Sequence, residues 1–113
     1  MLKRVALLLT ASVVAFAHAQ TDSGINAQAR TDFERTNATL KKAYDELLAR
    51  LPDAESKRKL GESQRAWIAF RDAEASFVAD QVRGGAAAPA ARYMSMKEST
   101  EQRIKQLKTA FRP

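Results

Sequence analysis

Side chains suited to catalysis or metal binding are scarce in this 113-residue sequence, which contains no cysteine and one histidine, His18. The lack of cysteine excludes disulfides, thiolate zinc sites, iron–sulfur clusters and a cysteine nucleophile. Ser56 and Lys59 have the spacing S-x-x-K, and Glu98 and Glu101 can share one face of a helix. The first pair lacks companion motifs, and the two glutamates lie among basic residues, as surface ion pairs do. We therefore expect no enzymatic activity, no bound metal and no cofactor.

A polar cluster on a predicted central helix is more informative. With about 100° between successive residues, Gln64, Trp67, Arg71 and Glu74 fall on the apolar face of a helix expected over residues 54–83. A charge buried without a partner is costly, so we expect Arg71 and Glu74, three residues apart, to pair. Two interpretations stay open: an internal network that fixes helix packing, or a partly open face that contacts a partner. The candidate residues for either role are Gln64, Arg65, Trp67, Arg71, Asp72, Glu74 and Arg103.

Three amphipathic helices can position these residues. We expect them over residues 25–51, 54–83 and about 91–111, with Asp53 as the cap of the second and Gly84-Gly85 as its end. No strand-like alternation interrupts them, so the predicted fold class is all-α. The helices should form an antiparallel bundle, or a long helical hairpin with the third helix packed back. The predicted apolar stripes are Ile25, Ala29, Phe33, Thr36, Leu40, Ala43, Tyr44, Leu47 and Leu51 in the first helix, and Tyr93, Met96, Thr100, Ile104, Leu107 and Phe111 in the third.

The N-terminus has the features of a secretory signal peptide. Lys3 and Arg4 precede an uncharged, mostly apolar run over residues 5–16, and Ala17-His18-Ala19 has the small-x-small form of a signal-peptidase site. The apolar run is shorter than the roughly 20 residues needed to span a bilayer. We expect cleavage after Ala19, which would leave residues 20–113 as one helical domain that is soluble in the periplasm or outside the cell. That mature chain would contain neither histidine nor cysteine.

Basic residues exceed acidic ones, and the excess lies in the last part of the chain. The full chain has a formal net charge of +6, and residues 90–113 contain six basic and two acidic residues. A basic amphipathic helix can lie against an anionic envelope polymer or a membrane surface. The alternative function is therefore an envelope-binding or adaptor module that uses Arg103, Lys105 and Lys108. We expect no nucleic-acid partner, because the chain is predicted to be exported and lacks an aromatic and basic stacking stripe.

The central segment also resembles a known family. Residues 63–74, SQRAWIAFRDAE, are similar to the signature of the LprI-type lysozyme-inhibitor domains, which are small exported bacterial proteins. Residues 40–47 resemble the family's first-helix pattern L-N-x-x-Y-x-x-L, with Lys41 in place of Asn. Gly84-Gly85 matches the glycine pair between helices, and residues 100–107 resemble the pattern T-x-x-R-x-x-x-L. The resemblance covers most of the predicted mature chain.

The sequence departs from this family at two cysteine positions. Members typically carry one cysteine directly after the R-D-A-E segment and another before the third-helix signature, where this chain has Ala75 and Ser95. A disulfide that closes this interval would contribute about 3 kcal/mol by loop entropy. Because both cysteines are absent, we expect the loop from Gly84 to Arg92 to be less constrained than in bridged relatives.

The resemblance implies a protein partner, lysozyme, bound stoichiometrically. Lysozymes of the animal type are strongly basic and cleave with two carboxylates in a cleft, so an inhibitor can offer acidic complementarity or insert a basic or polar finger. Since the predicted mature chain is itself basic, the sequence favours local insertion. The candidate binding loop comprises Arg83, Gly84, Gly85 and Arg92. The pattern leaves open whether the third helix packs within one chain or across a dimer.

Overall fold

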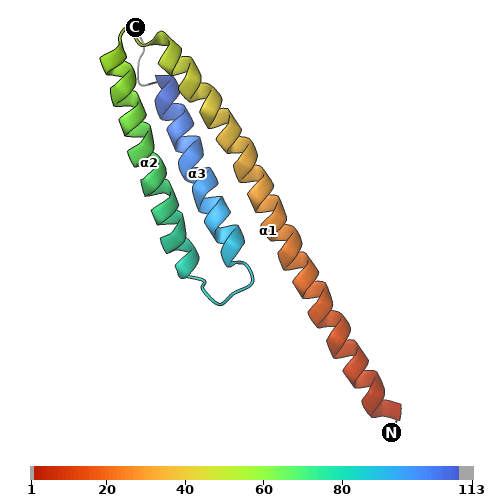
Figure 1. Cartoon of the computed structure of the whole chain (residues 1–113). Helices are drawn as coiled ribbons and strands as arrows, with labels where there is room; N and C mark the ends of the chain where they lie inside the picture. Colours follow the sequence, from red (N-terminus) through yellow and green to blue (C-terminus); the bar gives the residue numbers. More distant parts are fainter. Residues whose placement is uncertain (1, 110–113) are drawn as a thin grey trace.

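Three helices in an up–down–up order make up the part of the chain that the structure describes, residues 2–109 with side chains from residue 21 onward. In this computed structural model, α1 covers Leu2–Arg50, α2 covers Ala54–Asp80 and α3 covers Ala88–Thr109. Helix α3 packs against both other helices and lies between them, antiparallel to α2 (Figure 1). The predicted all-α fold with a packed-back third helix is confirmed.

Helix α1 is much longer than expected. It begins at Leu2 rather than Ile25, and it projects past the loop that joins α2 to α3 (Figure 1). Gly24 is the one strong helix breaker before Pro52, and a single glycine costs a helix only about 1 kcal/mol. The backbone therefore continues as helix from the segment expected to be the signal peptide into the first predicted helix. Within residues 21–109, no helix is both long and apolar enough to cross a membrane.

Helix α2 begins where the sequence predicted and ends earlier. Asp53 is its N-cap, and the carboxylate accepts a hydrogen bond of 2.7 Å from the backbone N–H of Ser56. The expected end at Arg83 is wrong, because the helix ends at Asp80 and residues 81–84 continue as turns. Gly84 has a φ of 81°, a left-handed conformation that a residue without Cβ adopts at little cost.

Helix α3 begins at Ala88 rather than near Ala91. Pro89, which was expected in the connection, lies instead in the first turn of α3. A proline is tolerated there because backbone N–H groups in the first turn have no partner within the helix. The described part of α3 ends at Thr109, and Phe111, which was expected on its stripe, lies outside the described residues.

The apolar core lies toward the end of the bundle where α1 turns into α2. Ile25, assigned to the first apolar stripe, is instead 48% exposed. Burial of the apolar side chains in this core is the main source of stability for so small a domain. The buried core residues are Leu40, Ala43, Leu47 and Leu107, and the partly buried residues packed against them are Tyr44, Leu51, Leu60, Trp67 and Ile104.

Candidate functional site

The polar cluster is built around Arg71, whose guanidinium lies between two aromatic rings. Its central carbon is 5.2 Å from the ring centroid of Trp67 on α2 and 5.2 Å from that of Phe33 on α1. Its Nε donates to Asp72 at 2.9 Å, and one terminal nitrogen donates to Oδ1 of Asn37 at 3.0 Å. Arg71 is only 7% exposed. Ring contacts and charge-assisted hydrogen bonds thus join α2 to α1.

Arg103 holds α3 to α2 in a similar way. Its guanidinium carbon lies 5.7 Å from the ring centroid of Trp67, so this tryptophan contacts two arginines. Its Nε donates to Oε1 of Gln64 at 3.0 Å and a terminal nitrogen donates to Oγ of Ser63 at 3.1 Å. Burial lowers the pKa of Arg103 from its ordinary value, yet a guanidinium stays protonated in proteins. The buried charge is therefore compensated by neutral oxygens and an aromatic face.

These contacts extend into a longer stack that crosses all three helices. The ring centroids of Phe33 and Tyr93 are 6.0 Å apart, and the Arg92 guanidinium lies 5.9 Å from the Tyr93 centroid. Among the described residues, every buried side-chain nitrogen and oxygen has a hydrogen-bond partner. A polar network that is fully satisfied in this way fixes how helices pack. Its members, in order along the stack, are Arg92, Tyr93, Phe33, Arg71, Trp67 and Arg103.

The expected pairing of Arg71 with Glu74 is wrong. Arg71 turns to Asp72 and Asn37, whereas Glu74 is exposed. The three-residue spacing identifies neighbours on one helix, but Arg71 points across to α1, where Asn37 satisfies the guanidinium without a buried carboxylate. Arg65, another candidate, is also exposed. The structure thus brings Gln64, Trp67, Arg71 and Arg103 together, with Asp72 at the edge, and leaves Arg65 and Glu74 at the surface.

The candidate binding loop is divided between a turn and a helix. Arg83 is exposed in the turn, with its terminal nitrogen Nη1 3.6 Å from Oδ1 of Asp80. Gly84 and Gly85 follow it. Arg92 belongs to α3 and not to the loop, because that helix begins at Ala88. The expectation of one continuous loop to Arg92 is therefore wrong.

Asn26 of α1 holds the connection between α2 and α3, although it was not among the residues expected at the site. Its side-chain amide donates to the carbonyl of Ala86 at 3.0 Å, and its Oδ1 accepts from the backbone N–H of Ala90 at 2.9 Å. The second bond satisfies one of the free N–H groups in the first turn of α3. Asn26 thus acts as a cap supplied by another helix.

A signal for Asn26 and Asn37 exists in the sequence. Asparagine is a poor helix former, yet both residues lie inside an uninterrupted helical pattern. They are 11 residues apart, about three turns, and so share a face with Phe33. Asparagines at such spacing inside a helix indicate contacts with the backbone or side chains of neighbouring helices.

Comparison with protein families gives one match. The model of the family described as Lysozyme inhibitor LprI matches residues 15–107. The chain belongs to the LprI family. No curated protein and no solved structure matches the chain. LprI is a family of inhibitors, and the match covers α2 and most of α1 and α3.

Part of the segment 63–74, which resembles the LprI signature, lies where helices meet. Trp67 and Arg71 of this segment form the stack, and Gln64 and Ser63 hold Arg103. At the two positions where the resemblance implies cysteines, Ala75 is fully buried on α2 and Ser95 is half-buried on α3. Among residues with described side chains, no group of three or more His, Asp or Glu could hold a metal ion.

Proposed function

We propose that this chain is an exported protein that protects the cell wall by binding lysozyme in a stoichiometric complex. The observation that carries the proposal is the family match, which extends over all three helices rather than over an isolated motif. Export through a signal peptide cleaved after Ala19 belongs to the same proposal. It predicts that protein purified from the periplasm begins at Gln20, which intact mass measures directly.

The arrangement of the motif supports binding rather than catalysis. Arg71 and Arg103 are held by Asn37, Asp72, Gln64 and Ser63, so their hydrogen-bonding capacity is largely used within the chain. We infer that Gln64, Trp67, Arg71 and Arg103 act as a scaffold. A scaffold fixed in this way presents its outer side chains without the entropy cost of ordering them on binding.

The alternative, an envelope-binding module that uses the basic third helix, draws less support from the geometry. Arg103, one of its three proposed cations, is 8% exposed and turned toward α2. Lys105 and Lys108 are exposed, but Lys97 lies 3.3 Å from Glu101 on the same helix. Two exposed lysines give only weak attraction to an anionic surface, roughly 1 kcal/mol each.

A cell-wall lysis assay tests the proposal. Purified exported protein, added in micromolar excess to several classes of lysozyme, should slow the clearing of a cell-wall suspension for at least one class. Unchanged clearing for every class would contradict inhibition. Sedimentation with anionic vesicles and with peptidoglycan, at low and high salt, provides the comparison, because an envelope-binding module would sediment in a salt-sensitive manner without slowing lysis.

A further inference from the structure

We propose that the surface formed by the C-terminal half of α2 and the adjoining part of α3 is where lysozyme binds. This inference rests on the proposed function and specifies its contact surface. We call this surface the α2–α3 face. It comprises the groove residues Val78, Met94 and Glu98 and, on the adjoining exposed flank of α2, Phe70, Glu74 and Phe77.

Large apolar side chains are unusually exposed on the α2–α3 face. Phe70, Phe77 and Met94 are 59%, 66% and 62% exposed. Phe77 lies three residues after Glu74 and seven after Phe70, so helical geometry places these three side chains side by side along α2. Val78, four residues after Glu74, lies next to them on the side of the groove. Aromatic and methionine side chains exposed together are characteristic of protein-binding surfaces.

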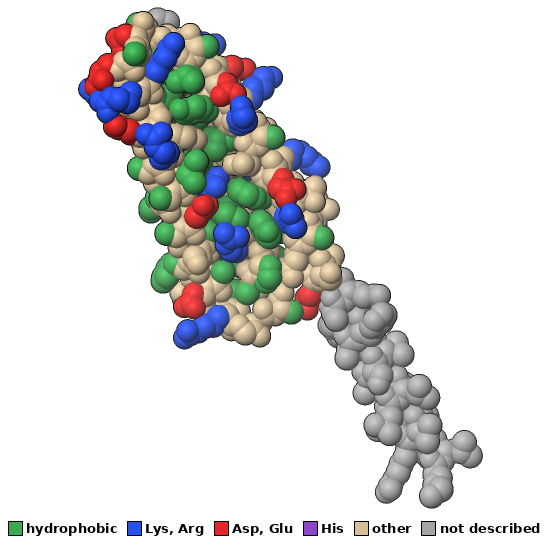
Figure 2. Space-filling model, in the orientation of Figure 1, with side chains coloured by type: hydrophobic (Ala, Val, Ile, Leu, Met, Phe, Trp, Pro, Cys, Tyr) green, Lys and Arg blue, Asp and Glu red, His purple; other side chains and the backbone are tan. Residues whose placement is uncertain are grey.

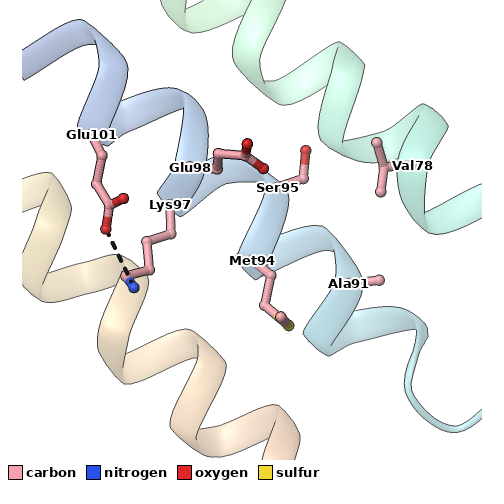
Figure 3. A pocket seen from close by; sticks show the side chains of 7 residues that line it. All are labelled: Val78, Ala91, Met94, Ser95, Lys97, Glu98 and Glu101. Atoms are coloured by element: carbon pink, nitrogen blue, oxygen red, sulfur yellow. Dashed lines mark ion pairs between the residues drawn. The ribbon is translucent and has the colours of Figure 1, made fainter.

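An open groove of about 510 Å³ joins the two helices of this face. Val78 of α2 lies on one side, and Ala91, Met94 and Ser95 of α3 lie on the other (Figure 3). Glu98 and Glu101 continue the same line along α3 (Figure 3). The groove therefore has an apolar floor, with Glu98 and the ion pair between Lys97 and Glu101 at one end. It can accept an apolar side chain of a partner next to a basic one that meets Glu98.

The charges on the α2–α3 face are acidic although the chain as a whole is basic. Between Ala66 and Asp80 the one cation, Arg71, is buried, so α2 exposes only carboxylates there. Glu74 on α2 and Glu98 on α3 form no ion pair with any described residue, and the nearby cation Lys97 is already paired. A basic protein meets complementary charge at this face.

Several cations of the described chain lie around the turn between α1 and α2, where Lys41, Arg58 and Lys59 pair with nearby carboxylates. Charged side chains crowd that end of the molecule, while hydrophobic ones form a band along its middle (Figure 2). A basic lysozyme can still meet the unpaired carboxylates of Glu74 and Glu98 at the α2–α3 face, because exposed charges act locally at physiological salt. The basic residues near the turn are Lys41, Lys42, Arg50, Lys57, Arg58 and Lys59.

Binding of an inhibited lysozyme to surface variants tests the inference. The pair Phe77→Ala with Met94→Ala should raise the dissociation constant at least about tenfold, because it removes two exposed anchors. The pair Glu74→Lys with Glu98→Lys should slow association several-fold and reduce its dependence on salt. Matched controls on α1, Ile25→Ala and Glu46→Lys, should leave the dissociation constant within about twofold. Melting temperatures that match the wild type confirm that each variant is folded.

Four outcomes would overturn the inference. If the wild type inhibits and both α2–α3 variants bind equally well, the proposed function stands and the surface is wrong. If Arg83→Ala abolishes binding and the α2–α3 variants do not, the loop between α2 and α3 is the contact surface instead. If the wild type is a dimer that dissociates on substitution of Phe77, the face is an interface between two copies of the chain. Failure of the wild type to bind any lysozyme contradicts the proposed function itself, and the inference falls with it.

Discussion

The guanidinium of Arg71 lies over the ring of Trp67, four residues earlier on α2, with 5.2 Å between the guanidinium carbon and the ring centroid. Arg103 of α3 contacts the same ring, and the Arg71 guanidinium carbon is also 5.2 Å from the ring centroid of Phe33 on α1. The pair formed by Trp67 and Arg71 thus contacts side chains of both other helices. The segment that resembles the family signature therefore contributes to holding the helices together.

Replacement of Arg71 by alanine should destabilise the fold. It removes two cation–π contacts and the hydrogen bond to Asn37, and we expect a loss of about 2–3 kcal/mol, or roughly 10 °C in melting temperature. Arg71→Lys should recover part of this loss, because it keeps the charge without the planar fork. The exposed Arg65 provides the matched control, and Arg65→Ala should leave the melting temperature nearly unchanged. An unaltered melting temperature in Arg71→Ala with lost lysozyme binding would instead identify Arg71 as a contact residue.

Replacement of Asn26 by alanine should release the connection between α2 and α3. Two hydrogen bonds are lost, to Ala86 and Ala90, and we expect a cost of about 1–2 kcal/mol. Trypsin should then cleave faster after Arg83, which lies in that connection. Gln28→Ala is the control, because Gln28 is exposed and bonds only within α1, to Asp32. Equal cleavage rates in wild type and Asn26→Ala would show that Asn26 does not hold the loop.

Asp53 should make part of the stability depend on acid pH. Its pKa is lowered mainly by the hydrogen bond that its carboxylate accepts from the backbone N–H of Ser56. Because the folded pKa lies below the unfolded value of about 3.9, this stabilisation is complete above that pH and is lost as pH falls through the folded pKa. Asp53→Asn keeps an acceptor oxygen but cannot titrate. Its melting temperature should therefore fall less on acidification than that of the wild type, and parallel curves between about pH 2 and pH 7 would contradict this assignment.

The double variant Ala75→Cys with Ser95→Cys should restore the bridge that the family resemblance implies. If the two positions adjoin, the oxidised variant gains about 3 kcal/mol, which corresponds to a rise of roughly 10 °C or more in melting temperature. Titration of free thiols and intact mass report bridge formation, and the reduced double variant is the control. Thiols that stay free under oxidising conditions would show that the two positions do not meet in this chain.

The helical periodicity of the sequence was enough to predict the fold class. Leu40, Ala43 and Leu47 recur at three- and four-residue spacing on the first predicted stripe, Leu107 belongs to the stripe of the third helix, and the structure buries all four together. Helix ends were predicted less well. The start of α3 was missed because Pro89 is compatible with the first turn of a helix as well as with a loop.

The partners within the polar cluster depend on tertiary contacts that local spacing does not contain. Spacing suggested Glu74 as the partner of Arg71, whereas the actual partner on another helix, Asn37, is 34 residues away in sequence. Asn26 reaches Ala90 over 64 residues. Such pairs become visible only once α1 is placed against α2 and α3, although asparagines inside a helix already indicate that contacts of this kind exist.

Calorimetric titration of the purified exported protein into lysozyme tests the central claim most directly. We predict saturable binding with one molecule of inhibitor per molecule of lysozyme, and lytic activity that falls to its minimum at the same equivalence point. Absence of any binding heat at several temperatures, together with full lytic activity at micromolar excess for every lysozyme class, would contradict the account.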